Sequence, residues 1–213
     1  MTSPPPLRYD TYYHIYNRGN NRENIFIQER NYNHFLNLYA KYIEPIAETF
    51  AYCLLRNHFH ISVRIKSEEE ILGYKKTLKG FTEPLGPDYA SRKFSDFFNA
   101  YAKAINNAYG RTGSLFQHPF GRVPVTTDRQ FWNVIAYIHQ NPQKHKFVDD
   151  FREWEYSSYG ILLSDKPTKL QRDIVFDWFG GKRGFLEHHK EWVADVDSRQ
   201  FAEDDSDWDA TRP

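Results

Sequence analysis

The first part of the chain alternates between strand-like and helix-like patterns of hydrophobic positions. "TYYHIYNRG" is rich in Tyr and Ile and stops at turn residues, which predicts a strand over about Tyr9 to Asn17. In "ERNYNHFLNLYAKYIEP" the large apolar side chains recur at helical spacing and stop before a proline, which predicts a helix with one buried face. "TFAYCLL" and "HFHISVRI" are β-prone runs separated by Arg56 and Asn57, a spacing that predicts an antiparallel hairpin.

The middle of the chain is less regular at first and then strongly helical. Gly, Pro and charged residues interrupt the pattern from Lys66 to Pro87, where only a short helix over about Glu68 to Thr77 is expected. Aromatic side chains along one side predict a longer helix from about Ser91 to Tyr109. "SLFQHPFGRVPV" predicts a strand, and its two prolines favour either a position at the edge of a sheet or an irregular strand.

The last strongly periodic segment is "RQFWNVIAYIHQ", which predicts a helix. Asp128 is the expected N-cap, and the helix is expected to halt at Asn141 and Pro142. The predicted order of elements is therefore β-α-β-β-α-β-α, with no internal repeat. From about Phe151 on, tryptophan and phenylalanine occur in short apolar patches, which predicts a C-terminal subdomain that wraps the core.

Composition is consistent with one globular domain in the cytoplasm. The chain has 213 residues, 40% of them hydrophobic and 17% aromatic, enough for a buried core. Cys53 is the only cysteine, so an intrachain disulfide is excluded and an oxidising compartment is not indicated. The N-terminus does not resemble a signal peptide, and no run approaches the roughly 18 apolar residues of a membrane span. A cytoplasmic protein with no membrane partner is expected.

Net charge is zero, which at first argues against a nucleic-acid partner. However, residues 195–213 carry seven Asp or Glu against two Arg, a balance of −5, so the rest of the chain carries +5. A block of like charge at a terminus predicts a solvated, poorly ordered tail. A tail that competes with DNA for the basic body is the alternative.

The candidate chemistry begins with His58 and His60, which stand two residues apart in a predicted strand and therefore face the same side. They are either two ligands of one divalent ion or ordinary packed or surface histidines, and the pair alone does not decide between these interpretations. Tyr137 and Asn141 stand four apart on the last predicted helix and share a face. Asn141 could offer a carbonyl oxygen to the ion, and the Tyr137 phenol could attack a phosphate that the ion polarises. The alternative is that Tyr137 belongs to the core.

Five motifs, taken together, resemble a known family. "YNRGNNRENIF", "AYCLLRNHFHISV", "NNAYGRTGSLFQHPF", "YIHQNPQKHKFV" and "WEYSSY" occur in the order and spacing of the single-tyrosine HUH transposases, which include the REP-associated tyrosine transposases of bacteria. The resemblance spans about residues 9–160. It implies an α+β, ferredoxin-like domain, in which helices flank an antiparallel sheet. A C-terminal extension over residues 161–194, packed on that core, and the acidic tail over residues 195–213 would complete the chain.

The resemblance also implies an activity. These enzymes cleave and rejoin single-stranded DNA next to hairpins formed by palindromic repeats, through a 5′-phosphotyrosine intermediate and with Mg²⁺ or Mn²⁺. Carried across by position, His58, His60 and Asn141 are the expected metal ligands and Tyr137 the expected nucleophile. The implied partner is hairpin-bearing single-stranded DNA, and the protein would act as a monomer or a homodimer in the bacterial cytoplasm.

Two departures from the family pattern lie close to these residues. Leu55 and Arg56 stand where the family commonly has Met-Pro, so the turn could be looser, or Arg56 could add a phosphate contact. "QKHKF" after Asn141 and Pro142 is more basic than usual. The basic residues predicted to contact DNA are Arg18, Arg56, Arg111, Arg122, Lys144 and Lys146. His139 points to another side of the helix from Tyr137 and is expected to be structural.

Three functions remain open from the sequence. The first is the strand transferase that the resemblance implies. The second is a domesticated protein that binds hairpin DNA without transposition activity. The third is a hydrolytic metal enzyme in which His58 and His60 serve a metal-bound water and Tyr137 is a core residue.

Overall fold

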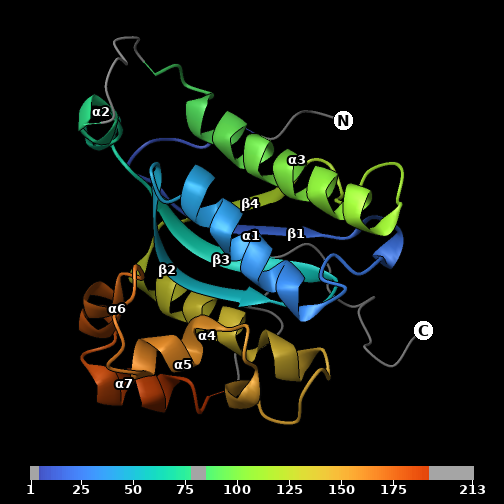
Figure 1. The fold of residues 1–213 in the computed structure, drawn as a ribbon. Coiled ribbons are helices and arrows are strands. Elements are labelled where there is room, and N and C mark those ends of the chain that lie inside the picture. Colours follow the sequence, from blue (N-terminus) through green and yellow to red (C-terminus); the bar gives the residue numbers. More distant parts are fainter. Residues whose placement is uncertain (1–4, 78–84, 192–213) are drawn as a thin grey trace.

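The computed structural model describes residues 5–77 and 85–191 and places them in an α+β fold (Figure 1). The acidic tail predicted for residues 195–213 lies outside the described residues. The strands are β1 (Tyr12–Arg18), β2 (Ala47–Leu54), β3 (His58–Ile65) and β4 (Gly121–Val125). The helices are α1 (Glu29–Tyr42), α2 (Glu68–Thr77), α3 (Tyr89–Tyr109), α4 (Asp128–Lys144), α5 (Ser158–Leu163), α6 (Arg172–Trp178) and α7 (Lys182–His188), with short 3-10 turns at Asn20–Arg22 and Phe151–Glu153.

The four strands form one antiparallel sheet in the order β2-β3-β1-β4. The predicted β2–β3 hairpin is confirmed, and the loop between its strands contains Arg56 and Asn57. β1 pairs with both β3 and β4 and so occupies the interior of the sheet. This order, combined with the element order β-α-β-β-α-β, is the ferredoxin-like arrangement and confirms the predicted fold class.

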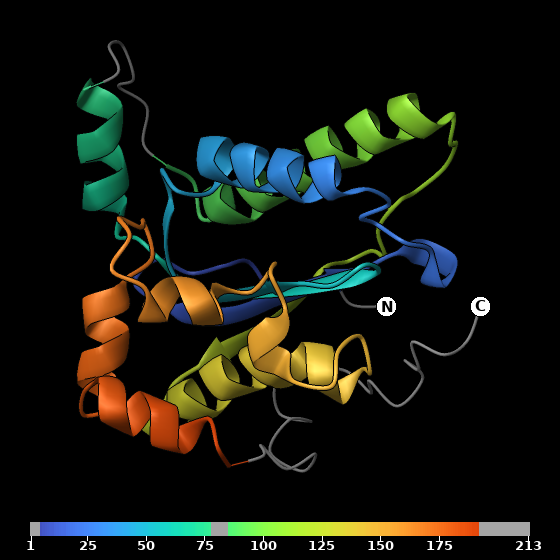
Figure 2. The same ribbon diagram turned by 60° about the horizontal axis from the view of Figure 1, so that its bottom comes forward.

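Helices cover the two faces of the sheet in separate groups. α1 and α3 lie on one face, and α4 to α7 lie on the other (Figures 1 and 2). The first face is packed with aromatic residues, among them Phe35 of α1, Phe59 of β3 and Phe97 of α3, all of them fully buried. Burying one such side chain contributes about 1.5–3 kcal/mol, so this layer is a large source of stability.

The second face has a core of its own, and the C-terminal residues contribute to it. Phe50 of β2 and Ile138 of α4 pack in the same cluster as Leu162, Val175 and Phe185, which come from α5, α6 and α7. The C-terminal helices therefore cover the second face of the sheet beside α4. This is the part of the chain that the short apolar patches predicted to wrap the core.

The outer edge of β2 is hydrogen-bonded to this C-terminal part. Leu54 N–H donates to the Tyr156 carbonyl oxygen, and Gln171 N–H donates to a carbonyl oxygen of β2, both at 2.9 Å. Between these two points the Ser158 hydroxyl accepts a hydrogen bond of 2.8 Å from Tyr52 N–H. Residues far along the chain thus satisfy backbone groups that an edge strand would leave to solvent.

The structure differs from the sequence prediction at β4. The strand begins at Gly121, whereas the pattern predicted it from Ser114. Before it, Phe116 makes only an isolated bridge to Gly19. Pro119, which cannot donate to a strand ladder, lies in the irregular part. The predicted edge position of this strand is confirmed.

α4 also differs from the prediction at both ends. Its N-cap is Thr127, whose hydroxyl accepts from Gln130 N–H, so Asp128 is already the first helical residue. The helix continues through Pro142 to Lys144. A hydrogen bond from His145 N–H to the Asn141 carbonyl oxygen closes the last turn, so the proline lies inside the helix instead of ending it. In the part of the chain that the structure describes, no helix has the length and apolarity to span a membrane.

Candidate active site

The register of the sheet brings side chains of β1 and β3 together on the face that α4 covers. Tyr16 lies opposite His60, and Arg18 lies opposite His58. Because directly opposed residues of an antiparallel pair share a face, His14, two residues before Tyr16, lies on this face as well. Polar and aromatic side chains from two strands therefore meet beneath one helix.

His58 and His60 are both buried, and their rings lie 5.1 Å apart, nearly perpendicular to each other. The prediction that they share a face is confirmed. Phe59 between them packs on the opposite face against Phe35 and Phe116. The strand is thus anchored in the aromatic core by one side chain and presents imidazoles on the other side.

α4 brings the predicted tyrosine and asparagine to the same place. The Tyr137 ring lies 5.4 Å from the His60 ring and 5.8 Å from the His14 ring, edge-on to both. Asn141 follows one helical turn later and is fully buried. Residues some 80 positions apart in the sequence therefore converge, as the sequence prediction required. Tyr137 is only 2% exposed, so it also belongs to the core cluster of this face.

Two buried polar atoms at this point fit a metal ion. The Asn141 amide nitrogen donates to the Tyr137 carbonyl oxygen at 2.8 Å, which fixes the amide and leaves Oδ1 without a hydrogen-bond partner among the described residues. Nε2 of His60 is likewise buried without a hydrogen-bond partner in the described part of the chain. A buried polar atom without a partner is costly, and a cation would satisfy a lone pair on either atom. The donor set of imidazole nitrogen and amide oxygen therefore fits a divalent ion.

A metal ion at this place would need Asn141 as a ligand in addition to the two β3 histidines. Among residues 5–77 and 85–191, no group of three or more His, Cys, Asp or Glu side chains is placed to hold a metal ion. His145, which lies one turn after Asn141, packs edge-on against His58 with ring centroids 4.9 Å apart. We therefore count His145 as a neighbour of the candidate ligands and not as a ligand.

The Nδ1 atoms of both β3 histidines contact a neighbouring side chain. His58 Nδ1 lies 2.7 Å from Asn57 Oδ1, and His60 Nδ1 lies 2.9 Å from His14 Nε2. Such contacts orient an imidazole and select which nitrogen carries the proton. Burial lowers the pKa of His60 well below its ordinary value, and the neighbouring His14, His145 and Lys144 lower it further, so His60 is neutral.

His14, Tyr16 and His145 also lie at this site and were not predicted from the sequence. Tyr16 lies beside the His14 and His60 rings, and its ring occupies the space where a side chain at position 121 would lie. Gly121 is therefore required for the Tyr16 position. The alternation in "YYHIYN" indicates that His14 and Tyr16 share one face of their strand, because they are spaced like His58 and His60. Placing them beside His58 and His60 also requires the pairing of β1 with β3, which the local pattern does not show.

Some of the predicted DNA-binding residues lie at this site and others lie near it in the chain. Arg18 lies beside His58 in the sheet, with its Nε donating to Gln117 at 2.7 Å. The Lys144 ammonium lies 5.0 Å from the centroid of the Tyr137 ring. Arg56 and Lys146 are both exposed, the first in the β2–β3 loop and the second just after α4. Their roles in DNA binding stay predictions.

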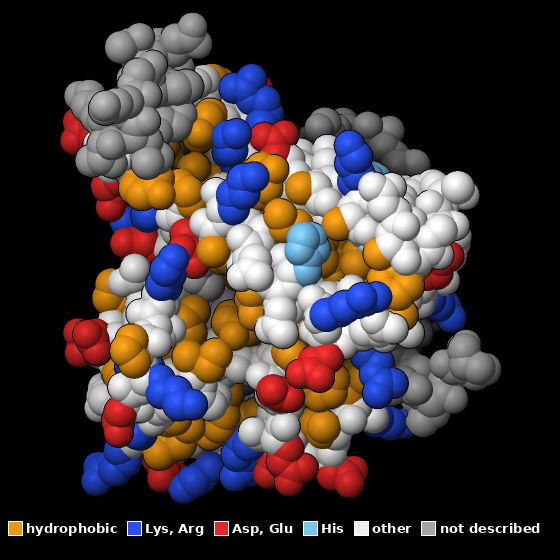
Figure 3. Space-filling model, in the orientation of Figure 1, with side chains coloured by type: hydrophobic (Ala, Val, Ile, Leu, Met, Phe, Trp, Pro, Cys, Tyr) orange, Lys and Arg blue, Asp and Glu red, His pale blue; other side chains and the backbone are white. Residues whose placement is uncertain are grey.

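Two other predicted DNA-binding residues are engaged elsewhere. Arg111 forms an ion pair with Glu23 and donates to Asn106, so its charge is offset. Arg122 lies opposite Ile15 in the sheet and donates to Ser91 of α3 at 3.2 Å, on the face away from the histidines. The structure therefore does not bring Arg122 together with the site. The face seen in Figure 3 carries Lys and Arg intermingled with Asp and Glu, without a patch of one sign.

His139, two residues from Tyr137, has the structural environment that the sequence analysis expected. It is fully buried, and its ring nitrogens lie 2.8 Å from His189 Nε2 and 2.8 Å from the Ser158 hydroxyl. These contacts link α4 to the C-terminal helices and, through Ser158, to β2. Burial lowers the pKa of His139 well below its ordinary value, so the ring is neutral.

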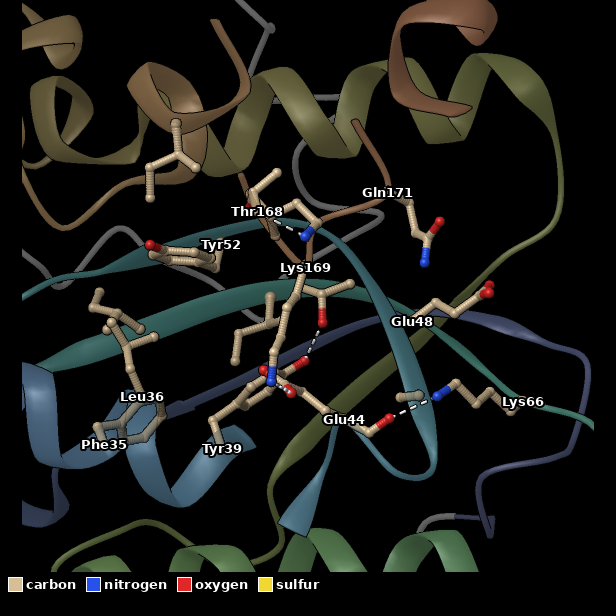
Figure 4. Close-up of a pocket in the computed structure, with 16 residues that line it drawn as sticks. Phe35, Leu36, Tyr39, Glu44, Glu48, Tyr52, Lys66, Thr168, Lys169 and Gln171 are labelled. Carbon is tan, nitrogen blue, oxygen red and sulfur yellow. Dashed lines mark hydrogen bonds and ion pairs between the residues drawn. The ribbon is translucent and has the colours of Figure 1, made fainter. Parts of the chain in front are cut away.

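A cavity of about 450 Å³ lies apart from these residues. It is bounded by α1, β2 and the segment around Lys169 (Figure 4). Lys169 pairs with Glu44, and Lys66 donates to the Glu44 carbonyl oxygen, so both cations at its rim are engaged. None of the candidate metal ligands lines this cavity, and it plays no part in the site.

A curated relative and a solved structure agree with the motifs, whereas no protein-family profile matches the chain. A curated relative from Haemophilus influenzae, described as a REP-associated tyrosine transposase, is 28% identical over 116 residues. The match covers 53% of this chain and 58% of the relative.

A solved structure is similar in fold. It is described as a REP-associated tyrosine transposase bound to a REP hairpin, with a TM-score of 0.56 at 16% identity. The similarity covers 78% of this chain and 88% of that one. The sequence relative and the structural neighbour carry the same family description, which confirms the resemblance drawn from the motifs.

Proposed function

We propose that this chain is a metal-dependent enzyme that cleaves and rejoins single-stranded DNA next to hairpins through a 5′-phosphotyrosine intermediate. The observation that carries the proposal is the meeting of Tyr137, Asn141 and the histidine pair of β3, with buried polar atoms of Asn141 and His60 that have no hydrogen-bond partner. The similarity to REP-associated tyrosine transposases supports the same activity.

His58 and His60 through Nε2, and Asn141 through Oδ1, would hold Mg²⁺ or Mn²⁺. When bound, such an ion would polarise the scissile phosphate and offset the charge that develops during attack. Contacts within the protein orient the three candidate ligand side chains before any ion binds. The Asn141 amide is oriented by the helix carbonyl of Tyr137, and the His58 and His60 rings are oriented by contacts at Nδ1.

Tyr137 supplies the nucleophile in this proposal. Its Oη gives up its proton and forms a bond to the phosphorus as the bond to the 3′ oxygen breaks, which leaves a 5′-phosphotyrosine, and the departing 3′ oxygen takes up a proton to become a hydroxyl. A second 3′ hydroxyl reverses the step and joins new strands without ATP. Because Tyr137 is 2% exposed, neighbouring side chains must move aside when DNA binds. Lys144, with its ammonium over the Tyr137 ring, is the flexible cation best placed to move toward a phosphate.

A covalent-adduct assay tests this function. Single-stranded DNA with a hairpin and a single-stranded flank is incubated with the protein and Mn²⁺, and the products are resolved in SDS. We expect an adduct with the natural chain and none with Tyr137→Phe. Tyr16→Phe is the matched control, because it removes the hydroxyl of a second tyrosine beside the same histidines, and its adduct should persist.

The outcomes separate the alternatives. A full-strength adduct in Tyr137→Phe would overturn the assignment of the nucleophile. Hairpin binding without cleavage in either metal would favour a DNA-binding protein that lacks the chemistry. Metal-dependent turnover that survives Tyr137→Phe without any adduct would favour a hydrolytic enzyme in which Tyr137 is a core residue.

A further inference from the structure

His14 of β1 lies in direct contact with a candidate metal ligand. It is fully buried, and its Nε2 lies 2.9 Å from Nδ1 of His60, with the two rings stacked at a 21° angle. The contact joins the central strands β1 and β3, whose register is continuous over seven residue pairs. The position of His14 relative to His60 is therefore set by the sheet itself.

The contact between two imidazoles admits two arrangements of protons. Either His60 donates from Nδ1 and keeps a lone pair on Nε2, or His14 donates and His60 carries its proton on Nε2. Only the first leaves His60 Nε2 able to bind a cation. In the second, an N–H would point into a buried position where His60 Nε2 has no hydrogen-bond partner.

His58 shows how the neighbouring ligand meets the same requirement. Its Nδ1 lies 2.7 Å from the Asn57 side-chain oxygen, and an amide oxygen only accepts hydrogen bonds. His58 therefore donates from Nδ1, which leaves its lone pair on Nε2. If His14 accepts a hydrogen bond from His60 Nδ1, as Asn57 accepts one from His58 Nδ1, both β3 histidines keep their lone pair on Nε2.

We propose that His14 is a positioning residue that accepts a hydrogen bond from His60 Nδ1 and thereby keeps the His60 Nε2 lone pair directed at the metal. This inference rests on the metal site of the proposed function. His14 itself then carries its proton on Nδ1. Partners of this kind raise metal affinity by about 10–100-fold, through ring orientation and choice of tautomer.

Metal affinity of three variants tests the proposal without reference to DNA cleavage. His14→Phe keeps a ring of similar volume but removes the acceptor, whereas His14→Gln offers a side-chain oxygen as acceptor. We expect His14→Phe to weaken Mn²⁺ binding by about 10–100-fold in calorimetry and His14→Gln to recover most of the loss. His34→Phe, which changes an exposed histidine of α1, should leave the affinity unchanged.

Nitrogen NMR of the natural, metal-free chain provides a second measurement that needs no variant at His14. The ¹⁵N shifts of the imidazoles report which nitrogen is protonated, and His60→Ala identifies the His60 signals. We expect a proton on Nδ1 of His60. A proton on Nε2, or a folded His14→Phe protein with natural Mn²⁺ affinity, would overturn the proposal.

Failure of this inference and failure of the proposed function are distinguishable. If the natural chain binds no Mn²⁺, the metal site of the proposed function is wrong, and the tautomer measurement still decides whether His14 accepts a hydrogen bond from His60 Nδ1. If the chain binds Mn²⁺, and His60→Ala abolishes binding while His14→Phe leaves the affinity unchanged, the metal site stands and the role of His14 is wrong.

Discussion

The two faces of one strand pair are built from opposite kinds of side chain. Toward α1 and α3, β1 and β3 present apolar residues such as Ile15, Phe59 and Val63, all fully buried. Toward α4 they present His14, Tyr16, His58, His60 and Ser62. All six buried histidines of the described chain lie on the α4 side, either on the sheet or on the helices that cover it.

This difference shows how a small sheet combines stability with chemistry. Side chains alternate along a strand, so each residue that packs the aromatic core holds its neighbours in place on the other face. The apolar face gains free energy by burial. The polar face needs a partner for every buried group, and His60 Nε2 has no hydrogen-bond partner among the described residues.

The largest predicted effect compares two neighbours in β3. Phe59→Ala leaves a cavity among Phe35, Phe98 and Phe116, and we expect it to lower the free energy of unfolding by about 3–5 kcal/mol in urea denaturation. His60→Ala should cost less, because it also removes a buried nitrogen that has no hydrogen-bond partner. A larger loss in His60→Ala than in Phe59→Ala would contradict the division between the faces.

The second prediction is that a metal stabilises the chain through the polar face. Free Mn²⁺ at a hundred times its dissociation constant should raise the free energy of unfolding by about 2.7 kcal/mol. His60→Ala should abolish the increase, and a chelator should reverse it in the natural chain. An equal increase in His60→Ala would locate the metal elsewhere.

The third prediction concerns pH and the buried histidines of the α4 side. Burial lowers the pKa of His189 to about 3 from an ordinary 6.5, so between these values the unfolded chain takes up a proton that the folded chain refuses. The free energy of unfolding should fall as the pH falls through this range, by up to about 1.4 kcal/mol per pH unit for this residue. Urea denaturation at several pH values measures the slope.

A pair of variants isolates the contribution of His189. His189→Gln should flatten the slope, because it removes a group that titrates only in the unfolded chain over this range. His34→Gln, which changes an exposed histidine of α1, is the matched control variant. An unchanged slope in His189→Gln would show that another group dominates the pH dependence.

The smallest effect distinguishes two arginines on opposite faces. Arg18→Ala should weaken binding of single-stranded DNA and reduce the slope of log K against log salt by about 0.7 for each phosphate that the protein no longer neutralises. Arg122→Ala should leave that slope unchanged, since Arg122 contacts Ser91 of α3 on the other face. Fluorescence anisotropy at several salt concentrations measures both. An equal change for the two arginines would mean that DNA follows a different surface.

Local patterns predicted most of the fold. The spacing of apolar residues was sufficient for α1, α3 and the β2–β3 hairpin, because these depend on residues close in sequence. The extra length predicted for β4 was wrong, because strand pairing near Phe116 is set by tertiary contacts. The early end predicted for α4 was wrong, because the hydrogen bond from His145 N–H to the Asn141 carbonyl oxygen continues the helix past Pro142. The ferredoxin-like arrangement of the sheet came from the family resemblance and not from periodicity.

The site was predictable only where its residues share an element. The pairs His58 and His60, and Tyr137 and Asn141, follow from strand and helix spacing, and the structure brings the pairs together. His14 depends on the pairing of β1 with β3, which no local pattern encodes. Arg122 was grouped with the DNA contacts because of its motif, whereas the register to Ile15 turns it to the opposite face.

The hydrogen bonds along β2 also bear on self-association. A sheet grows by accepting a foreign strand at a bare edge, which is how many proteins aggregate. Here Tyr156, Ser158 and Gln171 already occupy hydrogen-bonding positions along one outer edge. At the other edge, β4 is only five residues long and contains Pro124, which offers no N–H. Both edges of the sheet therefore disfavour the addition of a foreign strand. At β2 this protection comes from residues of the C-terminal part of the same chain.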